Sequence, residues 1–240
     1  FWLKAVHARS RPARMMQRFV VVLVCVCWVS AKEVSILNLL RHGEKCYDSG
    51  AGLAQKGKDR AAYLALCMST DDKSSAMPFG KATTVIASIR KKHKSTRPYD
   101  TVKPLADALG LDVKTPCQKD DSKCFAKHAR KYLSDQGTVV VSWQHEDIAR
   151  LVEAVNISGG LPEEFRQWPE ECPAEWWREP PCCYGDSVCY DEIWQVRLAR
   201  DGPDGDWAAA SIDRLHQGFQ GAADGPCSQG LAPEVRTIFQ

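Results

Sequence analysis

Arg41 and His42 stand where a predicted β-strand ends, and side chains of these two types can bind and attack an anionic group. Residues 34–39 form an apolar run typical of a buried strand, and Arg41, His42, Gly43 and Glu44 follow it. Open α/β sheets bind their ligands beyond the carboxyl ends of the strands. An arginine grips two oxygens of an anion at once, and a neutral imidazole has a lone pair for nucleophilic attack. A purely structural histidine is the alternative that this tetrapeptide leaves open.

Strand patterns and helix patterns alternate after this first strand. The run at 137–143 is apolar without interruption, as in strands that are buried on both faces. The β-branched residues of 83–89 also favour a strand. Strands that alternate with helices predict a three-layer α/β/α sandwich with a mostly parallel central sheet. The predicted helices, which have apolar residues at helical intervals, are 53–68, 98–109, 125–133 and 146–155.

The carboxyl-terminal third has a different character. Two strand patterns, 193–198 and 207–212, flank a turn rich in Asp and Gly, which predicts a C-terminal antiparallel hairpin. From about 156 to 190 the composition shifts to Pro, Trp, Cys and Glu, and no periodicity holds. We expect this stretch to be a disulfide-bonded loop insertion within one domain that spans 32–240.

The first 31 residues have the layout of a secretory leader. They hold basic residues and no acidic ones, and the apolar run 19–29 is followed by Ser30 and Ala31. The run is shorter than the roughly 20 residues that span a bilayer, so we expect cleavage rather than a stable membrane anchor. We place the signal peptide at about 15–31 and interpret the preceding residues as a gene-model extension. The expected location is outside the cell or in the lumen of the secretory pathway.

The charge balance excludes one large class of partners. The chain has 32 Lys and Arg residues against 30 Asp and Glu, a formal net charge of +2. Because the leader holds five of the basic residues and none of the acidic ones, the remaining domain is slightly acidic. Nothing in it resembles the basic footprint of a nucleic-acid-binding protein, and we expect no nucleic-acid partner.

Nine cysteines follow the leader, and in an oxidising compartment most would form disulfides. No Cys-x-x-Cys pair is present, so we do not expect a zinc site. Cys117 and Cys124 bracket a short acidic loop and are the expected pair. An odd number leaves one thiol over, and Cys67 in a predicted helix is the candidate. The nine are Cys46, Cys67, Cys117, Cys124, Cys172, Cys182, Cys183, Cys189 and Cys227.

Several segments between Val34 and Val155 resemble, in order, those of the histidine phosphatase superfamily, which includes phosphoglycerate mutases and histidine acid phosphatases. Residues 41–44 are similar to its signature at the end of the first strand. The segment at 52–61 is similar to its Gly-Leu-Thr-x-x-Gly-x-x-Arg-Ala motif, with Ala54 in place of the hydroxyl residue. The style is that of fungal-type secreted members, which share the Trp-x-His form. The other matching segments are the second-arginine helix at 97–106 and the second-histidine strand at 139–145.

This resemblance implies a phosphomonoester hydrolase that acts on a small phosphorylated substrate through a phosphohistidine. His42 would be the nucleophile, kept neutral by nearby arginines because they disfavour another positive charge. Arg41 and Arg97 would grip the phosphoryl oxygens, and His145 would donate hydrogen bonds to them. The reaction needs no metal or organic cofactor.

The leaving alcohol needs a proton, and the choice of general acid stays open. Glu146 is the first candidate, because it directly follows His145 where acid phosphatases of the family have an aspartate. Asp120 or Asp121 could serve instead if the loop between Cys117 and Cys124 folds over the site. Glu44 is expected to orient Arg41 or to contact the substrate.

Two other functions fit the same residues. A phosphoglycerate mutase-like phosphotransferase is disfavoured by the leader and the cysteines, because its substrates are cytosolic. A noncatalytic phosphate-binding protein would have no reason to keep the nucleophile His42 along with Arg41, Arg97 and His145.

Overall fold

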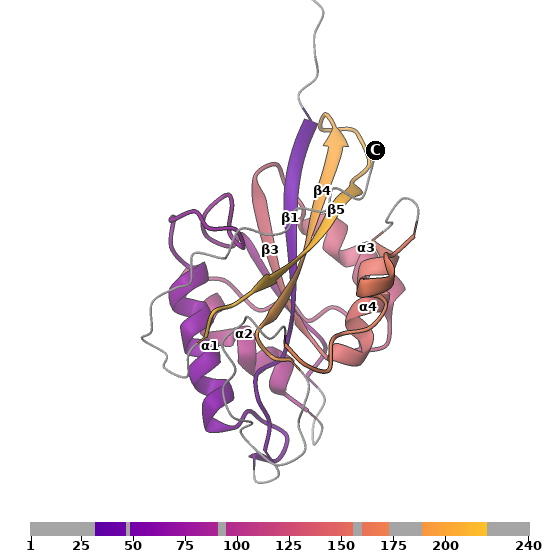
Figure 1. Cartoon of the computed structure of the whole chain (residues 1–240). Coiled ribbons are helices and arrows are strands. Elements are labelled where there is room, and N and C mark those ends of the chain that lie inside the picture. The colour runs from indigo at the N-terminus through magenta and orange to yellow at the C-terminus, as the bar shows by residue number, and fades with distance from the viewer. Residues whose placement is uncertain (1–31, 47–48, 91–94, 156–159, 173–188, 220–240) are drawn as a thin grey trace, which may run out of the picture. The chain divides into compact units, whose positions relative to one another are not determined.

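The described part of the chain folds around one sheet. The computed structural model describes residues 32–46, 49–90, 95–155, 160–172 and 189–219 (Figure 1). The predicted leader and residues 173–188 of the predicted insertion lie outside these ranges. In chain order the elements are β1 (Lys32–Arg41), α1 (Gln55–Met68), β2 (Thr84–Ala87), α2 (Arg97–Leu109), α3 (Ser122–Tyr132), β3 (Gly137–Trp143), α4 (His145–Ala154), the 3₁₀ helix η2 (Glu163–Phe165), β4 (Glu192–Asp201) and β5 (Ala208–His216).

The sheet is mixed, with strand order β2-β3-β1-β4-β5. β1 and β2 both pair in parallel with β3, whereas β4 pairs antiparallel with β1 and with β5. The α/β class is therefore confirmed. The sheet was expected to be mostly parallel, and this is corrected here, since half of its strand pairs are antiparallel. A short connection joins β4 to β5 and allows only antiparallel pairing, because a parallel pair needs a crossover of a dozen or more residues.

Two apolar cores pack against the strands. Leu37 and Leu39 of β1 belong to a core that includes Phe125 of α3 and Leu151 of α4, all fully buried. Leu40 of β1 belongs to a second core, which includes residues of α1 and α2. Successive side chains of a strand point to opposite faces of the sheet, so this alternation assigns α3 and α4 to one core and α1 and α2 to the other.

The parallel strands bring their carboxyl ends to one edge of the sheet. Arg41 of β1 lies opposite Trp143 of β3, and the backbone N–H of His42 donates to the Trp143 carbonyl at 3.0 Å. His145 begins α4 directly after β3, and Arg97 begins α2 after β2. Residues that are about 50 or 100 positions apart in the sequence therefore meet at this edge.

Disulfides hold the loops around this framework. Cys117 and Cys124 are bonded, which confirms the expected pair, and a second bond joins Cys172 to Cys189 across the predicted insertion. Cys67 was expected to be free, but it is disulfide-bonded, as is Cys46. Burial in a helix does not keep a thiol free in an oxidising compartment when another cysteine is within reach.

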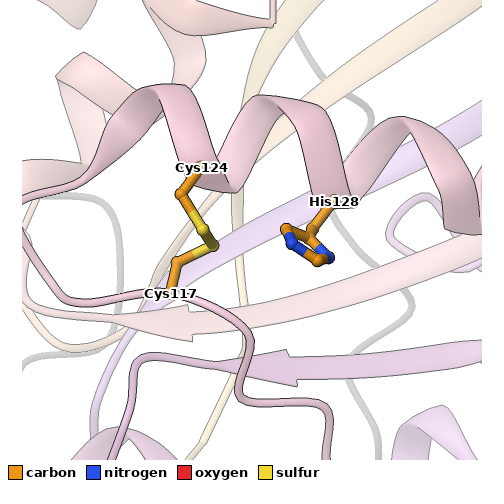
Figure 2. Close-up of side chains that lie close together, drawn as sticks. All are labelled: Cys117, Cys124 and His128. Atoms are coloured by element: carbon orange, nitrogen blue, oxygen red, sulfur yellow. A yellow bond between two sulfur atoms is a disulfide. The ribbon is translucent and has the colours of Figure 1, made fainter.

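His128 lies beside the disulfide between Cys117 and Cys124, one helical turn along α3 from Cys124 (Figure 2). One potential ligand atom from each residue lies within 4.8 Å of the others. Metals bind the thiolate form of cysteine, and both sulfurs are joined to each other here. The arrangement is thus a structural cross-link beside a histidine.

A search of the described residues for membrane spans finds no helix that is both long and apolar enough to cross a bilayer.

Candidate active site

A pocket of about 280 Å³ opens at the edge where the parallel strands end. This volume is near the lower end of small-molecule sites, which range over about 300–1,000 Å³. Residues that follow β1, β2 and β3 all contribute, so the sheet positions the pocket. Four of the residues predicted from the sequence line it, namely His42, Arg97, His145 and Glu146. The full lining is His42, Lys45, Ile89, Ser95, Arg97, Lys119, Gln144, His145 and Glu146.

His42 is the most deeply buried of these four, at 5% exposure. Its Nδ1 lies 2.8 Å from the Gly43 carbonyl oxygen. A carbonyl only accepts hydrogen bonds, so Nδ1 carries the proton and Nε2 of the neutral ring has the lone pair. Burial, followed by the charge of Arg41, lowers the pKa of His42 to about 3. The ring is therefore neutral at any physiological pH and carries a nucleophilic nitrogen.

Arg97 is held in place by the loop that follows β1. Its Nε donates to the Gly52 carbonyl at 2.9 Å, and one terminal nitrogen donates to the Gly50 carbonyl. The residue opens α2, where Pro98 occupies the first turn and lacks the N–H that would be unsatisfied there. The guanidinium is thus a fixed cation at the pocket, which is what binding an anion in a defined orientation requires.

Thr101 joins the loop that follows β1 to the start of α2. Its hydroxyl accepts from the Gly43 N–H at 2.7 Å and donates to the Arg97 carbonyl at 2.8 Å. The side chain is fully buried. One hydroxyl therefore fixes the spacing between the backbone beside His42 and the start of α2.

Glycine is required where the loop after β1 meets α1. A Cβ on Gly43 would lie 2.9 Å from the Gly57 carbonyl oxygen, and a Cβ on Gly57 would lie 2.6 Å from the Glu44 oxygen. These are backbone atoms that no rotamer change can move away. The close approach explains why both segments that resemble the family motif have a glycine at this point.

His145 and Glu146 form the first turn of α4. Their side chains are 22% and 63% exposed, and His145 Nδ1 lies 3.9 Å from a Glu146 carboxylate oxygen. Glu146 therefore reaches the solvent side of the pocket. Asp120 and Asp121, the alternative acids, are exposed and do not line the pocket. Asp121 instead caps α3 by accepting from the Cys124 N–H at 2.9 Å.

Arg41 lies behind the pocket and does not line it. Its side chain is fully buried, one terminal nitrogen donates to the Tyr190 hydroxyl at 3.1 Å, and the guanidinium stacks on the Tyr190 ring at 3.7 Å. In this arrangement its charge acts on His42, whose pKa it lowers. The expected grip of Arg41 on a phosphate stays a prediction.

Glu44 also lies outside the pocket. Its carboxylate binds Arg60 at 2.7 Å, and Arg60 binds Asp191 at 2.8 Å and the Gln217 amide oxygen at 2.9 Å. Burial alone would raise the pKa of the Glu44 carboxyl, but the charge and hydrogen bonds of Arg60 outweigh it and lower the pKa. This buried network ties the loop that follows β1 to α1 and to the segments that flank β4 and β5.

Six residues at or beside the pocket were not predicted from the sequence, and two of them are Ile89 and Ser95 in its lining. Lys45, Lys119 and Gln144 line it, and Tyr190 covers Arg41. Lys45 and Gln144 adjoin predicted site residues in the sequence, and this adjacency could have indicated that they line the pocket. Lys119 and Tyr190 come from loops whose approach to the site depends on tertiary structure, so no local pattern marks them.

The fold and the pocket define an α/β protein with a cationic small-molecule site, since three lysine and arginine side chains line the pocket against one carboxylate. No protein-family model matches the chain. No curated protein matches it. Among solved structures, it is similar to a mycobacterial glucosyl-3-phosphoglycerate phosphatase, with 14% sequence identity and a TM-score of 0.39 over 75% of this chain and 97% of the other.

Proposed function

We propose that the chain is a phosphomonoester hydrolase of the histidine phosphatase type, which acts on a small phosphorylated substrate through a phosphohistidine. One observation carries most of the weight: His42 is buried and neutral, and it shares a pocket with Arg97 and His145. A neutral histidine among cations is suited to attack a phosphoryl group, because the cations bind the oxygens while the imidazole keeps its lone pair.

In the first step Nε2 of His42 attacks phosphorus and forms a P–N bond, while the bond from phosphorus to the alcohol oxygen breaks. That oxygen keeps the electron pair, takes a proton from the Glu146 carboxylic acid and leaves as the alcohol. In the second step water attacks phosphorus and gives a proton to the Glu146 carboxylate. The electron pair of the P–N bond returns to Nε2, and inorganic phosphate leaves.

The surrounding groups stabilise charge in both steps. Arg97 and His145 donate to the phosphoryl oxygens as negative charge spreads over them. The Gly43 carbonyl accepts from Nδ1 and so stabilises the positive ring of the phosphohistidine. Burial and the charge of Arg41 keep His42 neutral, and Arg41 is also the second proposed phosphate ligand. The steps use no metal and no organic cofactor.

The same proposal includes the finer features of location and fold. We place the mature protein outside the cell or in the secretory lumen, since disulfides persist in oxidising compartments. We also assign it the three-layer sandwich with a C-terminal hairpin, which fits the two apolar cores and the antiparallel pairing of β4 with β5.

Hydrolysis of an aryl phosphate by the purified chain tests the activity. We expect release of phosphate by the wild type and a loss of at least about a thousandfold in kcat for His42→Ala, which lacks the attacking nitrogen. Absence of activity from pH 4 to pH 8 would overturn the proposal. Quenching turnover with alkaline denaturant should trap phosphate on His42 of the wild type but not on the variant, because the P–N bond of phosphohistidine survives in base and is hydrolysed in acid.

Glu146→Gln tests the general acid. An aryl leaving group needs little protonation and an alkyl one needs a proton, so we expect kcat to fall by about 10²–10⁴-fold for an alkyl phosphate. The loss for an aryl phosphate should be much smaller. Equal losses for both esters would show that another group supplies the proton. Added glycerol distinguishes hydrolysis from transfer, since a phosphotransferase would form glycerol phosphate.

A further inference from the structure

The pocket holds more positive charge than one phosphate group requires. A phosphate monoester carries two negative charges near neutral pH. Arg97 lines the pocket and Arg41 lies behind it, and these two balance that charge. Lys45 and Lys119 are additional cations, and Glu146 is the one carboxylate in the lining. In the proposed first step Glu146 is protonated, so it neutralises neither lysine.

Lys45 is placed by the loop that follows β1, which also carries His42. It follows Glu44, whose carboxylate and backbone are fixed by Arg60 and by the close approach of Gly57. Its side chain is half-buried, and among the described residues no ion pair involves it. The loop therefore points a cation that is not neutralised by this part of the chain into the same pocket as His42.

Lys119 reaches the pocket from a different element. It lies in the loop closed by the disulfide between Cys117 and Cys124, and its carbonyl accepts from the Trp143 indole N–H at 2.7 Å. Its ammonium group is 3.8 Å from Asp147, and the side chain is 53% exposed. Two fixed points in the backbone thus hold this lysine nearer the mouth of the pocket than the buried His42.

We propose that Lys45 and Lys119 form a second anion subsite, so that the preferred substrates are small phosphate monoesters that carry a carboxylate or a second phosphate beside the reacting one. This proposal rests on the proposed function, because it takes the pocket to bind a phosphoryl group at His42. The phosphoryl group occupies the deep end with Arg97 and His145, and the second anion lies between the two lysines. A charge-assisted hydrogen bond from a lysine at each side would select for that group.

Binding of phosphonates by the full chain tests the subsite without depending on turnover, because a P–C bond is not hydrolysed. Isothermal titration calorimetry compares 3-phosphonopropanoate with 3-hydroxypropylphosphonate, which has a neutral hydroxyl in place of the carboxylate. Propane-1,3-bisphosphonate distinguishes a second phosphate from a carboxylate. We expect both doubly anionic ligands to bind the wild type at least about tenfold more tightly than the hydroxyl ligand, a difference of about 1.4 kcal/mol.

Substitution of both lysines by methionine, Lys45→Met with Lys119→Met, keeps the side-chain length and removes the charges. We expect the preference to fall to within about threefold, while the affinity for the hydroxyl ligand changes little. Lys127→Met is the charge-matched control, since Lys127 is exposed on α3 outside this pocket. Arg150→Met removes the other cation paired with Asp147, at 3.6 Å, and controls for that loss. Both controls should keep the wild-type preference.

Equal affinity of the wild type for all three ligands would overturn the subsite and leave the phosphate pocket standing. A preference that persists in the double variant, or that disappears in a control, would overturn it as well. Failure of the wild type to bind any phosphonate would overturn the proposed function together with the subsite. A thermal melt of each variant shows whether a loss of binding reflects a loss of folding.

Discussion

The imidazole of His42 is kept neutral by its surroundings. Burial and the charge of Arg41 lower its pKa to about 3. From the sequence, the pair Arg41 and His42 suggested that the arginine would grip a phosphate. The structure gives Arg41 a fully buried place beneath Tyr190. A strand-end motif shows which residues are adjacent, but the depth of each side chain depends on what packs over it.

The depressed pKa of His42 predicts an acid-sensitive fold. The unfolded chain takes up a proton on this residue below its usual pKa of 6.5, whereas the folded chain does so only near 3. The free energy of unfolding should therefore fall as the pH decreases from about 6.5 toward 3, by up to about 1.4 kcal/mol per pH unit from this residue. Urea unfolding of wild type and His42→Gln between pH 7 and pH 4 measures it. The free energy of unfolding of the wild type minus that of the variant should decrease as the pH is lowered. A difference that stays constant with pH would contradict the prediction.

At the scale of elements, the strongest local patterns were the most predictive. β3 (Gly137–Trp143) coincides with the predicted strand, because its apolar run is uninterrupted and contains no helical spacing of polar residues. α2 and α4 begin within one residue of their predicted starts, since polar or proline residues mark those ends. The Arg60 network was not predicted, because it joins α1 to Asp191 across 131 positions of sequence.

Arg60→Met should destabilise the fold strongly. Arg60 is 4% exposed, and it binds two buried carboxylates, those of Glu44 and Asp191. Its removal leaves the Glu44 carboxylate buried without its cation, which typically costs about 3–5 kcal/mol, while Asp191 keeps its contact with His216 at 3.7 Å. Chemical denaturation at pH 7 measures the loss. Arg60→Lys is the matched control and should lose less, because it keeps the charge but not the forked geometry. A loss below about 1 kcal/mol for Arg60→Met would contradict this role.

α1 begins without a side-chain cap, and this offers a stabilising substitution. Ala54 is the N-cap residue, where the family motif that the sequence resembles has a hydroxyl residue, and no side chain accepts from the first turn. Ala54→Ser supplies an oxygen for the N–H groups of that turn and should raise the free energy of unfolding by about 1 kcal/mol. Denaturant unfolding of this variant and of Ala51→Ser, a nearby exposed site, tests it. Equal effects at both sites would contradict a capping mechanism.

At the scale of the whole molecule, the topology departs from the sequence-based prediction at one point. β4 enters the sheet beside β1 and runs antiparallel to it, with Asn38 opposite Gln195. Strand patterns predict that a segment pairs, but the partner and direction depend on contacts across more than 150 positions. The pocket is unaffected by this difference, because it is built at the ends of the three parallel strands β1, β2 and β3.

The disulfide between Cys117 and Cys124 links the stability of the molecule to its selectivity. The bond closes a loop with a sequence separation of 7, and loss of such a cross-link costs about 2–3 kcal/mol in the chain-entropy model. The double substitution Cys117→Ala with Cys124→Ala should therefore lower the free energy of unfolding by about that amount.

Because the loop carries Lys119, the variant should also lose most of its preference for 3-phosphonopropanoate over the hydroxyl ligand. Affinity for the hydroxyl ligand should be nearly unchanged, since His42, Arg97 and His145 come from other elements. Loss of stability without loss of preference in this variant would show that the Trp143 contact alone positions Lys119.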